Sequence, residues 1–154
     1  MSDQFNIALM GKSRQSMLKA AESLTEEQRT MVPAGFNNSI HWQLGHVVAV
    51  AESILYGFGG QPSELPKEYA AFFGPGTKPA DWTGQPPAWE DVVSRLQQQV
   101  VHARETFGSR MDSAVAVKEN FAKAETIQNL FELVAYHDGS HEGMVKAMAR
   151  IVQQ

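Results

Sequence analysis

The pattern of apolar and polar positions predicts four long helices. In four stretches apolar residues recur at steps of three and four, which is typical of one buried face of an α-helix. These stretches cover about residues 2–24, 39–58, 87–107 and 126–152. A short helical turn is expected after Thr25, which can cap it. Four amphipathic helices that each bury one stripe predict an all-α four-helix bundle, in one domain over residues 1–154.

Two long connections interrupt this pattern. Residues 59–86 hold five glycines and most of the prolines, so this stretch cannot continue a helix. It also carries several aromatic residues, namely Tyr69, Phe72, Phe73 and Trp82. We expect a packed lid or binding rim, or an ordered cover without a functional role. Residues 111–125 form the second connection, whose Ala-Val-Ala-Val piece is expected to pack as an extended strap. With connections of this length, periodicity alone leaves the neighbour order of the helices open.

The last helix carries two histidines, His137 and His141, one turn apart on its apolar side. The stripe there consists of Ile127, Leu130, Phe131, Val134, Val145, Met148 and Val152. An i,i+4 pair projects both imidazoles from one side of the helix, and a buried imidazole needs partners for its ring nitrogens. Either neighbouring polar groups satisfy two core histidines, or both bind one divalent metal ion. Two ligands are too few for a tight site, so the second interpretation requires a third ligand elsewhere.

His46 is the candidate for that third ligand. It lies off the main stripe of the second helix, on a flank with Trp42 and Val50. A helix that is apolar on two sides is covered on two sides, here by the bundle and by a pocket or partner. His41, near the helix start on the more polar side, is expected at the surface. His102 lies opposite the stripe of the third helix and is expected outside the site.

Two charged residues lie at or beside the predicted stripes. Arg14 interrupts the stripe of the first helix, and a snorkelling or rim-paired arginine is expected there rather than an inward-pointing functional cation. Asp138 lies beside the stripe of the last helix. It is expected to be a surface aspartate, or alternatively to orient a metal ligand from behind.

Composition and charge narrow the possible functions. A formal net charge of -4 argues against a nucleic-acid binder, and no apolar run approaches the ~20 residues of a membrane span. The chain has no cysteine, hence no disulfide and no thiolate ligand. Because the N-terminal stretch lacks the features of a signal peptide, a cytoplasmic location is expected. The apolar flank with Trp42, Ala49 and Val50 suggests a homodimer, unless the long connection covers it.

Two segments resemble a known family. The segment Ser39-Ile40-His41-Trp42-Gln43-Leu44-Gly45-His46 is similar to the start of the second helix in the DinB/YfiT-like superfamily. The segment from Tyr136 to Gly143 resembles its H-x-x-x-H-x-G motif in the last helix. The resemblance implies a four-helix bundle that binds a divalent metal (nickel, zinc or iron in different members), with His46, His137 and His141 as ligands. The chain departs from the motif at Met144, where relatives often have glutamine.

Three neutral imidazoles leave at least one position of an ion open for water or substrate. The resemblance implies thiol S-transfer from low-molecular-weight thiols such as bacillithiol, thiol-dependent isomerisation, or metal-dependent hydrolysis. We expect a metal-dependent transferase that uses such a thiol on a small-molecule substrate. The alternatives are a metal-dependent hydrolase and a non-catalytic metal-binding or interaction protein. The helix carries no HExxH motif, because its histidine pair reads His-Asp-Gly-Ser-His.

Overall fold

The computed structural model describes residues 2–154, and the side chains of residues 5–154. Over this range the chain folds into four long helices with short helical segments between them, so the predicted four-helix bundle is confirmed. The long helices are α1 (Ser2–Ala21), α3 (Ile40–Glu52), α5 (Trp89–Phe107) and α6 (Ile127–Val152). The short segments are α2 (Glu26–Thr30), the π-helical η1 (Ser53–Phe58), α4 (Glu68–Phe73) and the 3-10 turn η2 (Pro79–Asp81).

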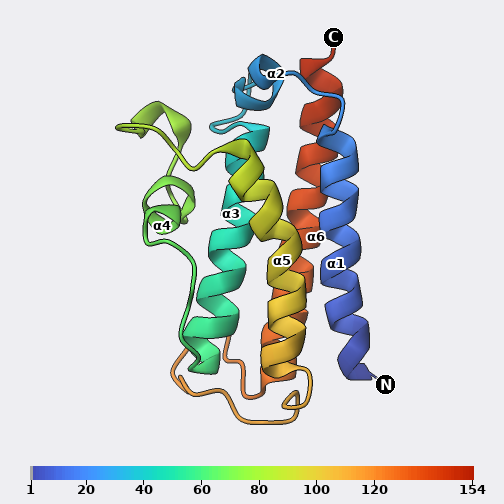
Figure 1. The fold of residues 1–154 in the computed structure, drawn as a ribbon, viewed down its shortest axis with the longest axis vertical. Helices are drawn as coiled ribbons and strands as arrows, with labels where there is room; N and C mark the ends of the chain where they lie inside the picture. Colours follow the sequence, from blue (N-terminus) through green and yellow to red (C-terminus); the bar gives the residue numbers. More distant parts are fainter. Residues whose placement is uncertain (1) are drawn as a thin grey trace.

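The four long helices form a ring of neighbours. α1 packs beside α6 and α5, and α3 packs beside α5 and α6. In Figure 1, α1 and α6 run upward while α3 and α5 run downward, so α3 and α6 are antiparallel. The connection between α3 and α5 therefore travels the length of the bundle, from the lower end of α3 to the upper end of α5 (Figure 1). The helical periodicity of the sequence had left this neighbour order of the helices open.

Polar side chains cap the helices where the sequence changes from loop to stripe. The Ser39 hydroxyl accepts a hydrogen bond from the backbone N–H of Trp42 at the start of α3. Thr126 and Asn129 form a capping box at the start of α6, and Thr25 and Gln28 form one at α2. Each cap satisfies backbone donors that a helix start leaves without partners. These caps fix where α3 and α6 begin, and with them the depth at which their histidines lie.

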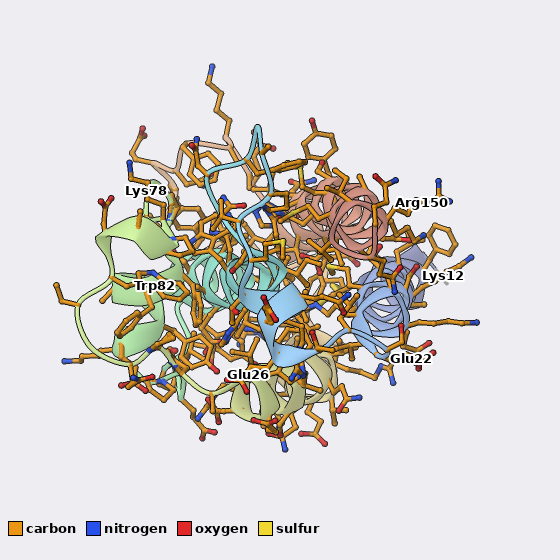
Figure 2. All side chains as sticks on the ribbon, turned by 90° about the horizontal axis from the view of Figure 1, so that it is seen from above. Lys12, Glu22, Glu26, Lys78, Trp82 and Arg150 are labelled. Carbon is orange, nitrogen blue, oxygen red and sulfur yellow. The ribbon has the colours of Figure 1, made fainter. Side chains whose placement is uncertain are left out.

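The connection after α3, residues 59–88, covers the second apolar side of that helix and is called the covering segment below. Its short helix α4 lies against α3, and Trp82 and Lys78 lie on the same side of the bundle when it is seen from above (Figure 2). Trp42 is 5% exposed and donates its indole N–H to the Thr77 hydroxyl, and Ala49 is 9% exposed. The flank that suggested a dimer is therefore largely covered within one chain. A homodimer stays a prediction, without this support.

Backbone hydrogen bonds anchor the Ala-Val-Ala-Val piece of the second connection, residues 114–117, which was expected to pack as a strap. The backbone N–H of Val115 donates to the carbonyl of Glu125, and those of Ala116 and Val117 donate to the carbonyl of Phe58. This strap closes the end of the bundle opposite α2 (Figure 1). Of the helices in residues 2–154, none combines the length and the apolar character that crossing a bilayer demands.

A glycine in α3 lets the covering segment approach closely. A Cβ atom at Gly45 would overlap ring atoms of Phe73, a fully buried residue at the end of α4. The absence of a side chain at Gly45 therefore allows the Phe73 ring to lie directly on the α3 backbone. The next residue in α3 is His46, so this close approach sets the surroundings of the predicted ligand.

Gly45→Ala should displace Phe73 and destabilise the protein by about 1–3 kcal/mol, because an added methyl group in a filled core forces its neighbours to move. Urea unfolding measures the change. Gly139→Ala is the matched control, since that helical glycine is exposed and nothing lies within 4 Å of its added Cβ. The control should gain about 0.5–1 kcal/mol. Equal stability of both variants would contradict the close packing.

Candidate metal centre

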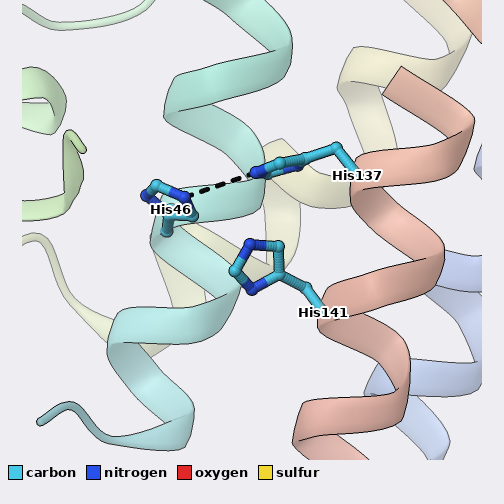
Figure 3. Close-up of side chains that lie close together, drawn as sticks. All are labelled: His46, His137 and His141. Carbon is cyan, nitrogen blue, oxygen red and sulfur yellow. Dashed lines mark hydrogen bonds between the residues drawn. The ribbon is translucent and has the colours of Figure 1, made fainter. Parts of the chain in front are cut away.

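The fold brings together the three histidines that the sequence singled out. His46 extends from α3 toward α6, and His137 and His141 extend from α6 toward α3, so that the three rings meet between the helices (Figure 3). One ring nitrogen of each lies within 4.8 Å of the others. The Nε2 atoms of His46 and His137 are 3.3 Å apart. In the described part of the chain, this is the cluster of His, Asp and Glu side chains that could hold a metal ion.

Backbone from the covering segment orients His46. Its Nδ1–H donates to the carbonyl oxygen of Phe73 at 2.7 Å, so its Nε2 carries the free lone pair. The indole of Trp42 stacks on the other side of this ring, with centroids 4.4 Å apart and planes 14° from parallel. His46 is only 7% exposed. Its ring is therefore held at Nδ1 by Phe73 and on one face by Trp42, with Nε2 directed toward α6.

A side-chain amide orients His141. The Nδ1–H of His141 donates to Oε1 of Gln43 at 2.5 Å, which leaves its Nε2 free. The amide nitrogen of Gln43 donates in turn to Oδ1 of Asn38 at 2.6 Å, so the amide orientation is settled by two partners. The sequence analysis missed this role of Gln43. The available signal was its position three residues before His46, on the side of α3 that faces α6.

His137 has a different neighbour, the carboxylate of Asp138. Its Nδ1 is buried without a hydrogen-bond partner, and it lies 3.6 Å from Oδ1 of Asp138, which is also buried and without one. Asp138 is fully buried, so its interpretation as a surface aspartate is wrong. Its other oxygen, Oδ2, accepts from Nε of Arg14 at 2.8 Å.

Arg14 lies inside the bundle, 1% exposed, so the prediction of a snorkelling or rim-paired arginine is wrong. Three neighbours accept from its guanidinium: the Asp138 carboxylate, the Leu96 carbonyl and the Gln99 side chain. Gln99 also donates to the Val48 carbonyl and to Glu52. A charge can be buried when it is paired and hydrogen-bonded in this way. Its partners lie far along the chain, so periodicity could not reveal them.

The histidine cluster fits a divalent ion. Ligand distances of 2.0–2.1 Å in a tetrahedral site place two nitrogens roughly 3.3 Å apart, and the two Nε2 atoms are separated by 3.3 Å. Without an ion, these two Nε2 atoms need a proton between them. A neutral His137 carries one N–H, so it can supply that proton only if its Nδ1 is unprotonated. An ion at Nε2 instead places the proton of His137 on Nδ1, facing Oδ1 of Asp138. One cation thus accounts for two of the buried atoms that lack partners, Nδ1 of His137 and Oδ1 of Asp138.

The electrostatic surroundings favour neutral ligands. Burial, with a smaller contribution from nearby His137, lowers the pKa of His46 to about 4, against the effect of its hydrogen bond to Phe73. Burial likewise lowers the pKa of His141 to about 4, with His137 and His46 adding to the effect. Both imidazoles are therefore neutral at pH 7. A histidine binds metal in this neutral form, so the site needs no deprotonation of these two residues.

Comparison with known proteins places the chain in a family. Its sequence matches the DinB superfamily over residues 10–145, a range that includes all three histidines. The chain belongs to the DinB superfamily. Among solved structures it is similar to a conserved protein from Enterococcus faecalis, with a TM-score of 0.68 and 15% sequence identity. That similarity covers 97% of this chain and 96% of the other, and at this identity it concerns the fold alone. No curated protein matches the sequence.

The remaining histidines of this DinB-superfamily chain lie outside the cluster. His102 is exposed, as expected. His41 is 7% exposed, so its prediction as a surface residue is wrong. Its Nε2–H donates to the carbonyl of Pro87, and its ring packs against Phe73 and Trp89. The side of α3 that carries His41 looked polar in the sequence, but the covering segment and the start of α5 bury it.

Two cavities lie away from the histidine cluster. One of about 480 Å³ lies between α3, α5 and the covering segment, with Glu52, Gln99 and His102 among its lining residues. The other, of about 470 Å³, lies between α1 and α5. Neither includes His46, His137 or His141. His137 and His141 stay partly exposed, so solvent reaches the cluster although it lies in neither of these cavities.

The metal-free protein should lose stability as the pH falls from 6.5 toward 5. Burial lowers the pKa of His41, His46 and His141 in the folded state. An unfolded chain binds protons at these residues from about pH 6.5 downward, while the folded chain does not, so protons favour unfolding. Urea unfolding in a chelator at several pH values measures this dependence. His141→Asn removes one of the groups and should show a smaller fall. Constant wild-type stability over this range would contradict the prediction.

Proposed function

We propose that this protein is a metal-dependent transferase in which His46, His137 and His141 hold a divalent ion. The observation that carries the proposal is the convergence of three imidazoles in a partly exposed cluster, two of them oriented by hydrogen bonds and neutral. In residues 2–154 this cluster contains three ligand groups and no fourth. Structural zinc sites use four protein ligands, whereas catalytic sites keep a position open.

An ion in this site would supply Lewis acidity, lowering the pKa of a bound thiol or water and polarising a bound carbonyl. The chain's own residues set the conditions for that chemistry. The Phe73 carbonyl and Gln43 keep two ligands in the tautomer that presents Nε2. Trp42 covers one face of His46 and excludes water from it. Nickel, zinc and iron all accept imidazole ligands, and the proposal includes each of them.

A low-molecular-weight thiol is the co-substrate that we propose. Its sulfur forms a bond to an electrophilic carbon of the second substrate while the bond from that carbon to its leaving group breaks. The leaving group departs with the bonding pair, and the thiol proton goes to solvent. A thiol activated by a metal is deprotonated without a separate carboxylate base. This suits a site in which Asp138, the adjacent carboxylate, is fully buried and paired with Arg14. A cytoplasmic location, where such thiols are kept reduced, is part of the proposal.

Metal titration tests the ligand set. We expect calorimetry to show zinc or nickel binding weakened by more than 100-fold in each of His46→Ala, His137→Ala and His141→Ala. Substitution of a residue that only hydrogen-bonds to a ligand typically costs 10–100-fold. His102→Ala is the control, because that side chain is exposed and lies outside the cluster. Metal should also raise the melting temperature of the wild type, since the unfolded chain has no assembled site. Equal affinity in all four variants would refute the ligand set.

Trp42 should report metal binding by its fluorescence. Its indole stacks on the His46 ring at 4.4 Å, so an ion on the far nitrogen of that ring changes the electronic environment of the indole. We expect saturable quenching on metal addition, with the same midpoint as the calorimetric titration. Trp42→Phe should keep metal binding and lose most of the quenching. The two remaining indoles, Trp82 and Trp89, pack against His41, which lies outside the cluster. An unchanged signal in Trp42→Phe would contradict this arrangement.

Activity assays test the reaction class. Metal-loaded protein should consume a low-molecular-weight thiol together with an alkylating electrophile, and His137→Ala should abolish this turnover. Ester or amide hydrolysis without a thiol requirement would favour the hydrolase alternative. Absence of turnover in a broad screen, with metal binding intact, would favour a non-catalytic metal-binding protein.

A further inference from the structure

The ion pair between Arg14 and Asp138 is an unusual feature of this core. Both side chains are almost completely buried, and Nε of Arg14 lies 2.8 Å from Oδ2 of Asp138. Apolar residues of similar size often replace such a pair without loss of stability, because desolvation of both charges offsets their attraction. Stability alone is therefore a weak reason for charges at these positions. The pair lies directly behind the histidine cluster, which suggests another reason.

Asp138 divides its two oxygens between two partners. Oδ2 accepts from Arg14, whereas Oδ1 has no hydrogen-bond partner and lies 3.6 Å from Nδ1 of His137. That nitrogen is itself buried without a partner. The gap exceeds the 2.7–3.2 Å of an N–H···O hydrogen bond by a few tenths of an ångström. A carboxylate behind a metal-bound histidine fixes the ring and its tautomer by accepting the other N–H.

We infer that Asp138 is a positioning residue for His137, and that Arg14 holds Asp138 in the orientation this requires. The inference rests on the proposed metal site. The ring of His46 is oriented by a backbone carbonyl and that of His141 by an amide, so Asp138 supplies the corresponding acceptor for the third ligand. It is a charged acceptor, and therefore the strongest of the three.

Hydrogen bonds to a third helix, α5, hold the Arg14 side chain in place. Its Nη1 donates to the Leu96 carbonyl at 3.0 Å and to Oε1 of Gln99 at 2.8 Å, both on α5. The amide nitrogen of Gln99 donates to the Val48 carbonyl on α3 at 3.1 Å. Contacts from all four long helices thus converge behind His137. The geometry of this ligand depends on the assembled bundle rather than on α6 alone.

The competing explanation is that the pair only packs α1 against α6. In that case its replacement changes the melting temperature and leaves metal affinity and the protonation of His137 unchanged. A positioning role changes both. The two explanations therefore differ in measurements that a purely structural role does not affect.

Two charge-balanced double variants test the inference. R14Q/D138N keeps a neutral acceptor at position 138, and R14M/D138L removes the acceptor while keeping the interior filled. Zinc dissociation constants, measured by calorimetry below the melting temperature of each variant, should rise about 10–100-fold in R14M/D138L and less in R14Q/D138N. The matched control is E142Q/K146Q, which neutralises an ion pair one turn apart on the outer part of the same helix. It should bind zinc as the wild type does.

Imidazole nitrogen NMR of the zinc-loaded protein provides the second readout. The wild type should show His137 with zinc on Nε2 and a slowly exchanging proton on Nδ1, and R14M/D138L should lose that slow exchange. Wild-type zinc affinity and an unchanged Nδ1 proton in folded R14M/D138L would overturn the inference while leaving the metal site intact. Failure of the wild type to bind zinc or nickel would instead overturn the proposed function itself.

Discussion

The rest of the structure depends on how the bundle accommodates a buried charge. Arg14 of α1 reaches Asp138 of α6, and Gln99 of α5 joins them and continues to the backbone of α3. A buried guanidinium without these partners would destabilise the fold by several kcal/mol, so the four helices are constrained to one relative placement. That same placement brings His46 within reach of His137 and His141. The polar interior and the candidate metal centre are thus parts of one arrangement.

Each histidine of the candidate centre faces a different kind of acceptor. His46 depends on a backbone carbonyl of the covering segment, His141 on an amide of α3, and His137 faces a carboxylate of its own helix. In the proposed site, groups outside the ligand set would therefore preorganise the ligands. Gly45 contributes to the first of these contacts, because only a residue without a side chain lets Phe73 lie on α3.

The sequence predicted the four helices and the three histidines because both depend on local spacing. Helical stripes need only neighbours three and four residues away, and His137 and His141 lie on one face for the same reason. The errors concern residues whose partners are distant. His41 meets Pro87, which is 46 positions away, and Arg14 meets Asp138, which is 124 positions away. Periodicity identifies the faces of a helix, but it does not reveal which segment will cover each face.

The two long connections both lie outside the four long helices, yet they should differ in their tolerance of inserted residues. Irregular surface segments usually accept extra residues, because few buried contacts depend on their length. The strap between α5 and α6 has such a place at its exposed tip, around Lys118 and Glu119. The part of the α3–α5 connection around Phe73 and Thr77 does not, because Phe73 supports His46 and Thr77 holds Trp42. A loop graft or fusion at the strap would leave the histidine cluster intact, whereas the same change beside Phe73 would remove a support from His46.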